Sequence, residues 1–225
     1  MNSTNDPGAG SCDEVECTLR EAIVAANVDG GAENIIFDIP GNGPHTIQLD
    51  LSLPTLSDSV NITNTSGEKI TVRGEGSTEP YRIFTIDPGQ TVNISGLTIT
   101  NADTSNNFFS NGGGIFNQGT LTLTNSSVSG NSAINGGGIS NFGTLTVANS
   151  IVSSNSAIGY NNCNGGGIYN QGTLTMTNST VSGNSSALDG GGISNEGLSI
   201  LTNSTVSGNH SARFAGGIDN KGTLR

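Results

Sequence analysis

The side chains that could do chemistry are concentrated in the first 90 residues of the chain. Asp13, Glu14 and Glu16 form an acidic run, and carboxylates are the ligands that Ca²⁺ prefers. We expect these three to form a solvated acidic loop rather than a calcium site. His45 and His210 are isolated histidines, which we expect to lie on the surface.

A second set of acids and bases lies between residues 50 and 87. Enzymes that cleave acidic polysaccharides need carboxylates, often a bound Ca²⁺, and an Arg or Lys base on one face. The set is scattered rather than patterned: Asp50, Asp58, Glu68, Lys69, Arg73, Glu75, Glu79, Arg82 and Asp87. Between residues 101 and 209 there is no Lys or Arg, and the acids are Asp103, Asp189 and Glu196. We therefore expect no catalytic residues, no cofactor and no metal.

Cys12 and Cys17 are five residues apart near the N-terminus. A disulfide between them would close a small loop and contribute about 2–3 kcal/mol at most. Two free thiols or half of a metal site are the alternatives, although the chain has no second Cys or His pair at zinc spacing. A disulfide would indicate an oxidising, extracytoplasmic environment. Cys163 is expected to be an incidental thiol.

The charge of the chain excludes several classes of partner. The formal net charge is −11, whereas nucleic acids and anionic membranes are bound by clustered Lys and Arg. The sequence has neither a run of 18 apolar residues nor a signal segment. We therefore expect no nucleic-acid partner and no direct membrane insertion. Because the chain stops inside a strand-like segment, we expect a fragment of a longer repeat array.

Five Gly-Gly-Ile runs mark a repeat. The isoleucines are Ile115, Ile139, Ile168, Ile193 and Ile218, so successive steps are 24, 29, 25 and 25 residues. Apolar and polar residues alternate within the unit, as at Leu121 and Leu123 among threonines, which predicts strands with one buried face. Three strand-like pieces in about 25 residues are typical of one coil of a parallel β-helix and too few for a propeller blade. We predict this all-β fold, with the isoleucines stacked in its core.

Asparagines recur at three positions of the unit. One set follows each isoleucine by two residues and points inward with it, so that amides would bond from coil to coil about 4.8 Å apart. These residues are Asn117, Asn141, Asn170, Asn195 and Asn220; the alternative is an amide satisfied by the local backbone. Two further sets are expected at sharp corners, where Asn tolerates a left-handed backbone. They are Asn125, Asn149, Asn178 and Asn203, then Asn131, Asn155, Asn184 and Asn209.

Two irregularities interrupt the repeat. The segment Ser156–Asn164 has nine residues where the previous coil has four, Ser132–Asn135, and is expected to bulge from one corner. Thr202 is one residue more than the preceding coil needs, which predicts a β-bulge.

The outward positions of one predicted strand carry threonine. They are Thr120, Thr122, Thr124, Thr144, Thr146, Thr173, Thr175 and Thr177. A flat Thr-x-Thr array is the kind of face that ice-binding solenoids present, but threonine is also simply a good exposed strand residue. The array is expected to fail in the fourth regular coil, where we place Gly197, Ser199 and Leu201 in those positions.

A helix is predicted ahead of the repeats. Thr18 and Glu21 form a capping box for a helix over residues 18–28, with apolar residues on one face. That face would cover the open end of the first coil. We divide the chain into a cap at 1–33, irregular first coils at 34–100 and regular coils of about 25 residues at 101–225.

The segment Cys-Thr-Leu-Arg-Glu-Ala at residues 17–22 resembles the Cys-Ser-Leu-Arg-Glu-Ala motif that opens many secreted bacterial and archaeal β-helix proteins. The Gly-Gly-Gly-Ile and Ser-Gly-Asn-Ser repeats are also similar to those of polymorphic outer-membrane adhesins. The resemblance implies a right-handed β-helix, secretion and often a surface location, and it transfers no catalytic or binding residue.

We therefore expect an extracellular or cell-surface structural module: a stalk, adhesin or filament-forming subunit without catalysis. Its partners would be further copies of itself or surface glycans. A carbohydrate-binding or polysaccharide-degrading protein is the alternative, with the glycan on a strand face or on the 156–164 loop beside Tyr160. An ice-binding solenoid is the second alternative.

Overall fold

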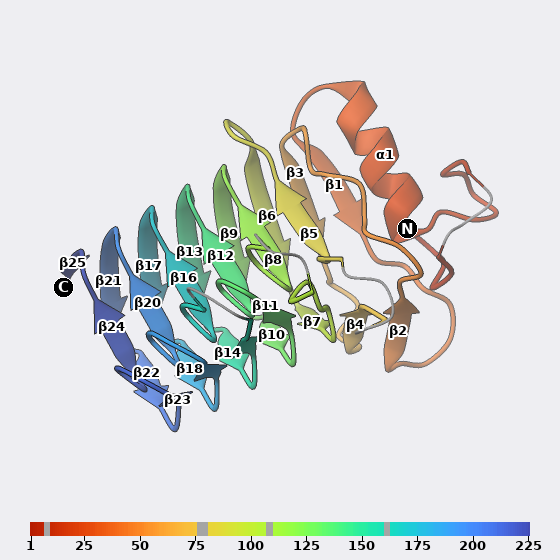
Figure 1. Cartoon of the computed structure of the whole chain (residues 1–225). Coiled ribbons are helices and arrows are strands. Elements are labelled where there is room, and N and C mark those ends of the chain that lie inside the picture. Colours follow the sequence, from red (N-terminus) through yellow and green to blue (C-terminus); the bar gives the residue numbers. More distant parts are fainter. Residues whose placement is uncertain (7–9, 76–80, 107–109, 160–162) are drawn as a thin grey trace.

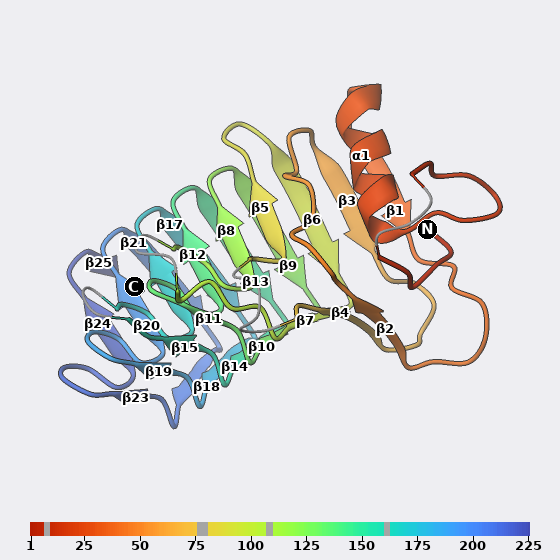
Figure 2. The same cartoon turned by 45° about the vertical axis from the view of Figure 1, so that its right-hand side comes forward.

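The computed structural model describes residues 1–6, 10–75, 81–106, 110–159 and 163–225, and it shows a β-solenoid (Figure 1). Four sheets of parallel strands run along the molecule, and each successive coil adds a strand to a sheet. Figure 2 shows the coils stacked as open loops, with the only helix of the described residues at the N-terminal end. The parallel β-helix predicted from the repeat and the short N-terminal helix predicted from the capping box are both confirmed.

The four sheets differ in their number of strands, and we name them A to D. Sheet A contains β1 (Glu33–Ile36), β3 (Val60–Thr63), β6 (Thr91–Ser95), β9 (Thr120–Thr124), β13 (Thr144–Ala148), β17 (Thr173–Thr177), β21 (Leu198–Thr202) and β25 (Thr223–Leu224). Sheet B contains β2 (His45–Gln48), β4 (Ile70–Arg73), β7 (Leu97–Thr100), β10 (Ser127–Ser129), β14 (Ile151–Ser153), β18 (Thr180–Ser182) and β22 (Thr205–Ser207). Sheet C contains β5 (Phe84–Ile86), β8 (Ile115–Asn117), β12 (Ile139–Asn141), β16 (Ile168–Asn170), β20 (Ile193–Asn195) and β24 (Ile218–Asn220). Sheet D contains β11 (Ser132–Ala133), β15 (Ser156–Ala157), β19 (Ser185–Ser186) and β23 (His210–Ser211).

Sheet D adds a fourth strand to the coils that contribute to it, whereas the sequence predicts three strands per coil. Its strands are two residues long, and a two-residue segment is too short to show the alternation that reveals a strand. Ala133 and Ala157 pair across it and are fully buried. Small side chains suit this position, because the second glycine of each Gly-Gly-Gly run packs against the neighbouring sheet-D backbone. A Cβ on Gly137 would collide with the carbonyl oxygen of Ser156.

One apolar core runs through the solenoid. Leu121, Leu123 and their equivalents point inward from sheet A, while the alternate threonines lie outside. The predicted isoleucine stack lies in sheet C, where Ile115, Ile139, Ile168 and Ile193 are fully buried and aligned, and Ile218 of the last coil is partly buried. The same buried cluster extends back to the helix, so the first coils and the regular coils share one core.

The asparagines of sheet C form a hydrogen-bonded ladder inside the solenoid. The Nδ2 of Asn117 donates to Oδ1 of Asn141 at 2.7 Å, and the same bond links Asn141 to Asn170 at 2.7 Å. The ladder continues from Asn170 to Asn195 at 2.7 Å and from Asn195 to Asn220 at 2.6 Å. Each of these four Nδ2 atoms also donates to backbone carbonyls, for example that of Thr144 for Asn117. The Nδ2 groups of these amides are therefore satisfied, as burial demands, whereas Oδ1 of Asn117, at the start of the ladder, has no partner among the described residues.

The two corner sets behave differently from each other. Asn125, Asn149, Asn178 and Asn203 adopt a left-handed backbone, with φ of 49–50°. The prediction for the second set is wrong, because the left-handed residue there is the preceding one: Gly130, Ser154, Gly183 and Gly208. This frees the next asparagine to turn inward, and its amide forms a second ladder. Asn131 donates to Asn155 at 3.1 Å, Asn155 to Asn184 at 3.0 Å and Asn184 to Asn209 at 2.9 Å.

The predicted bulge at Thr202 is also wrong. Strand β21 pairs with β17 without interruption, and Thr202 lies opposite Thr177. Leu198 and Ile200 occupy outward positions, while Ser199 points inward and is fully buried. The misalignment arose because Ser199, a polar residue, stands where the earlier coils have leucine. Its hydroxyl is accommodated by a hydrogen bond to Oδ1 of Asn195 at 2.8 Å.

The longer coil accommodates its extra residues beyond sheet D. Ser156 and Ala157 keep their places in β15, paired with Ser132 and Ala133, so the insertion begins after Ala157 rather than at Ser156. Cys163 is buried at its far end, packed with Ile134 and Ala157. Tyr160 lies outside the described residues, as does Glu79.

The N-terminal helix α1 (Leu19–Asp29) covers the first coil, as Figure 1 shows. Both bonds of the capping box are present: Thr18 Oγ1 accepts from the Glu21 N–H, and the Glu21 carboxylate accepts from the Thr18 N–H. Leu19 and Ile23 are fully buried in the same core cluster as Ile35 and Phe37 of the first coil. The helix thus replaces the coil that would otherwise pack there.

Candidate functional site

The cap brings together several of the residues singled out in the sequence. Cys12 and Cys17 form a disulfide, with Cα atoms 4.1 Å apart, directly before the helix. The Asp13 carboxylate accepts the N–H groups of Glu16 and Val15, and these bonds lower its pKa. Among the described residues, no group of three His, Cys, Asp or Glu side chains is placed to hold a metal ion. The Glu16 carboxylate of the same loop accepts hydrogen bonds from the side chains of Ser3 and Asn5.

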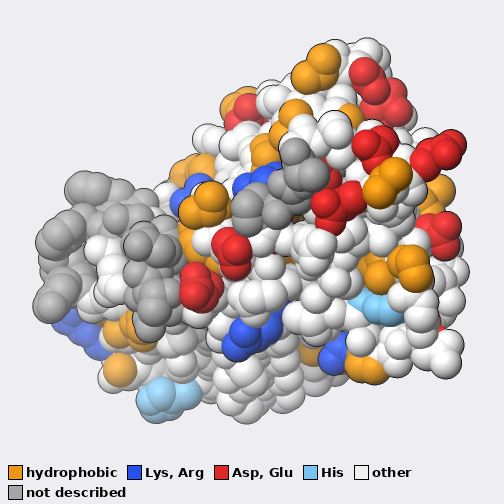
Figure 3. All heavy atoms as spheres, turned by 90° about the vertical axis from the view of Figure 1, so that its right-hand side faces the viewer, with side chains coloured by type: hydrophobic (Ala, Val, Ile, Leu, Met, Phe, Trp, Pro, Cys, Tyr) orange, Lys and Arg blue, Asp and Glu red, His pale blue; other side chains and the backbone are white. Residues whose placement is uncertain are grey.

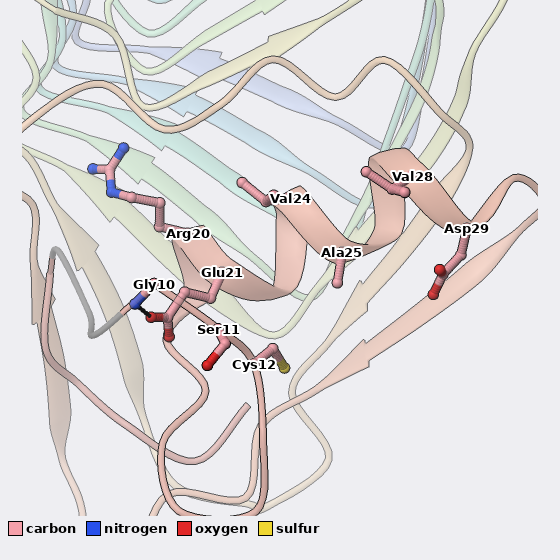
Figure 4. A pocket seen from close by; sticks show the side chains of 9 residues that line it. All are labelled: Gly10, Ser11, Cys12, Arg20, Glu21, Val24, Ala25, Val28 and Asp29. Carbon is pink, nitrogen blue, oxygen red and sulfur yellow. Dashed lines mark hydrogen bonds between the residues drawn. The ribbon is translucent and has the colours of Figure 1, made fainter.

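A hollow of about 410 Å³ lies between α1 and the loop that carries Cys12. Figure 4 shows Val24, Ala25 and Val28 along the helix side, and the Glu21 carboxylate bonded to the N–H of Gly10 across it. Arg20 projects away from this loop and binds Asp6 and the carbonyl groups of residues 51 and 52. Because the charged groups of Arg20 and Glu21 are hydrogen-bonded within the cap, the wall of the hollow is mainly apolar.

The cap end of the molecule carries many acidic side chains (Figure 3). Figure 3 views the molecule from the cap end, where Asp and Glu side chains gather beside smaller apolar patches. His45 and His210 lie in β2 and β23, half-buried and exposed respectively. The two histidines lie far apart, in the first strand of sheet B and the last strand of sheet D.

The threonine array lies on the outer face of sheet A. Thr120, Thr144 and Thr173 are aligned across β9, β13 and β17, as are Thr122, Thr146 and Thr175. The third row contains Thr124, Ala148 and Thr177. The next strand breaks the array with Leu198 and Ile200, which replace the residues named for these positions from the sequence.

Sheet C carries a second outward face, and the sequence analysis did not single it out. The middle residues of its strands form one row: Thr85, Phe116, Ser140, Tyr169, Ser194 and Asp219. The residues after each inward asparagine form a neighbouring exposed row: Gln118, Phe142, Gln171, Glu196 and Lys221. Backbone bonds from each residue of this second row to the coil before keep the coils in step.

Three aromatic rings form a continuous strip on this face, which we call the aromatic strip: Phe116, Phe142 and Tyr169. The rings of Phe116 and Phe142 have centroids 5.5 Å apart at 76°, and those of Phe142 and Tyr169 are 6.2 Å apart at 72°. Both are edge-to-face contacts, which aromatic quadrupoles favour. Ser140 lies between Phe116 and Tyr169 in its row and is fully buried, so its small side chain leaves room for the rings.

Charged and polar groups are attached to both ends of the strip. The guanidinium of Arg82 lies 4.8 Å from the centroid of the Phe116 ring, a cation–π contact, and burial lowers the pKa of Arg82. At the other end, the Tyr169 hydroxyl donates to Oε2 of Glu196 at 2.9 Å and accepts from Nε2 of Gln171 at 2.7 Å. Burial, and then the bond to Glu196, raise the pKa of Tyr169.

Beyond Glu196 the charges are paired. Asp189, which is buried, binds Nζ of Lys221 at 2.7 Å, and Asp219 lies 3.4 Å from the same ammonium. The hydrogen bond to Asp189 raises the pKa of Lys221 above its ordinary value. Lys221, from the last coil, thus neutralises Asp189, which lies in the stretch from residue 101 to 209 that contains no Lys or Arg.

The strip was within reach of sequence reasoning. Period-2 alternation already placed Ile and Asn of each Ile-x-Asn-x segment inside, which puts both x residues outside. Aligning those x residues gives Phe116, then Phe142, then Tyr169 on successive coils. The repeat itself does not indicate the strip, because these positions vary from coil to coil whereas a repeat is recognised by the residues that recur.

No helix among the described residues is both long enough and apolar enough to cross a bilayer. Comparisons with protein-family models, with curated proteins and with solved structures found no match.

Proposed function

We propose that this protein is an extracellular or cell-surface structural module, a rigid and non-catalytic rod that presents adhesive faces. The observation that carries the proposal is the unbroken asparagine ladder, which links five successive coils and in which the first four amides are buried. Each coil is joined to the next by parallel strand pairing and by these internal rows. A coil could not separate from its neighbour without leaving buried polar groups unpaired, which costs about 1–3 kcal/mol for each group.

A third internal row adds to this stiffness. The hydroxyl oxygens of Ser150, Ser179 and Ser204 each accept the backbone N–H of the equivalent serine one coil earlier, at 3.1–3.2 Å. The interior therefore carries polar rows at three corners around one aliphatic stack. Several parallel rows of internal hydrogen bonds suit a rod that must resist extension.

Two further observations support an extracellular setting. The Cys12–Cys17 disulfide is the kind of cross-link that persists in oxidising environments. The cysteine motif beside it resembles that of secreted β-helix proteins, which often lie at the cell surface. Association between copies, laterally or end to end, is part of the same proposal, and electron microscopy at rising concentration tests it.

Mechanical pulling tests the rod directly. The protein is attached through its two termini and extended in an optical trap, and we expect it to resist until coils detach at a defined force. An Asn141→Leu variant should yield at lower force, because it interrupts the ladder at its second rung. Extension of the wild type like that of an unfolded chain would reject the load-bearing role. Release of reducing ends from polysaccharides by the pure protein would reject the non-catalytic part.

A further inference from the structure

We propose that the aromatic strip on sheet C, with the residues beside it, binds a neutral polysaccharide. The inference rests on the proposed function, because it assigns the adhesive face of the rod and the chemical class of its ligand. Phe142 is the stacking platform, and Gln118, Gln171 and Glu196 are the groups that bind sugar hydroxyls. The ligand would run along the rod, across successive coils.

Phe142 has the exposure that a sugar ring needs. Its side chain is 40 % exposed, whereas Tyr169 is buried. The C–H groups on one face of a pyranose carry partial positive charge, and they pack on the negative face of an aromatic ring. Because the Phe142 ring makes one edge-to-face contact with Phe116 and another with Tyr169, little conformational freedom remains to be lost on binding.

The polar groups next to Phe142 match sugar hydroxyls. Gln118 and Gln171 are exposed on the coils directly before and after it, in the same outward row. The Gln118 amide can both donate and accept hydrogen bonds, as a sugar hydroxyl does. Nε2 of Gln171 already donates to Tyr169 and Glu196, so Gln171 offers its Oε1 as an acceptor. Glu196 follows one coil later, held by Tyr169 and Gln171 through Oε2. The arrangement is an aromatic surface with a few placed polar groups, as in small-molecule sites.

Charge selects a neutral chain over an acidic one. The basic groups of this face are already engaged: Arg82 lies on the Phe116 ring, and Lys221 is paired with Asp189 and Asp219. The chain as a whole has a formal net charge of −11, which repels a polyanion. A polysaccharide of uronic acids is therefore disfavoured, and uncharged hexose or pentose units are favoured.

Affinity electrophoresis in native gels tests the proposal. The gels contain hydroxyethyl cellulose, glucomannan, xyloglucan or dextran as neutral probes, and polygalacturonate as the acidic probe. We expect at least one neutral polysaccharide to slow the wild-type protein, and polygalacturonate not to. Phe142→Ala and Phe142→Leu should lose several-fold in apparent affinity, about tenfold at the upper end of one aromatic contact. Phe142→Trp should retain binding.

The controls separate binding from folding. Ile151→Ala removes another exposed apolar side chain, 49 % exposed and in the same coil but on sheet B, and should bind as the wild type does. Circular dichroism and the melting temperature verify that every variant folds, and Phe142→Leu keeps the apolar volume if Phe142→Ala does not fold. Absence of retardation by all four neutral probes, or equal retardation of Phe142→Leu and the wild type, overturns the inference. Either result leaves the pulling test of the rod unaffected.

Discussion

The outer faces of sheets A and C are built on the same coils but carry different information. On sheet A, threonines recur at the same positions in three consecutive coils. On sheet C, the outward residues change at every coil, from Phe116 through Ser140 to Tyr169. The inward isoleucine and asparagine of sheet C nevertheless repeat without change from β8 to β24. What repeats in this chain therefore builds the rod, and what departs from the repeat on an outward face is free to serve recognition.

The sharpest way to test this division is to put a charge at a repeated inward position. Ile139→Asp buries a carboxylate inside the stack between Ile115 and Ile168, within coils that contain no Lys or Arg. We expect the free energy of unfolding to fall by more than about 4 kcal/mol, or folding to fail. Urea denaturation followed by circular dichroism measures this. Thr146→Asp, outward on the same coil, is the matched control and should cost about 1 kcal/mol or less.

Breaking a polar inward row should have the next largest effect. Asn141→Leu removes the donor to Oδ1 of buried Asn170 and the acceptor for one N–H of Asn117. We therefore expect the free energy of unfolding to fall by about 2–3 kcal/mol. Asn149→Gly supplies the comparison, because Asn149 is an exposed corner residue with φ of 49°, which glycine adopts easily. It should change the stability by less than about 0.5 kcal/mol. Equal losses for both variants would contradict the ladder's role.

The residues show why some features were predictable from the sequence and others were not. The coil, the isoleucine stack and the asparagine row of sheet C follow from strict spacing and alternation. The second asparagine ladder was missed because Asn131 and Gly130 are both suited to a left-handed corner, and sequence alone did not show which takes it. The β21 register was misassigned because Ser199 is a buried polar residue. The aromatic strip depends on contacts between different coils at positions that do not repeat.

Tyr169 allows the variable face to be probed through pH. Its pKa is raised in the folded protein above the ordinary value of 10.0, chiefly by burial. The folded state therefore holds this proton more tightly than the unfolded state does, and its contribution to stability is complete below pH 10. As the pH rises above 10, the unfolded state releases the proton first and stability falls. Tyr169→Phe should flatten this decline, as seen in melting temperatures between pH 8 and 11.

A second tyrosine must be separated from this effect. Burial also raises the pKa of Tyr81, which lies in the first coils, so it adds a decline of the same sign. Tyr81→Phe is therefore the control. It should reduce the fall in melting temperature at alkaline pH, and adding Tyr169→Phe to it should reduce that fall further. If the Tyr169→Phe profile matched that of the wild type, the hydroxyl would not be held by Glu196 as the structure shows.

The smallest effect is expected on the repeated outward face. An ice-binding surface requires a broad regular array. Here the first two threonine rows end at Leu198 and Ile200 of β21, and the second row also ends at Asn93 of β6. We therefore expect no thermal hysteresis and no ice shaping by the purified protein. Thr146→Val, which removes only a hydroxyl from the middle of the array, should change the free energy of unfolding by less than about 0.5 kcal/mol. Hysteresis that Thr146→Val abolishes would instead make sheet A a recognition face, and repetition would then no longer distinguish scaffold from binding surface.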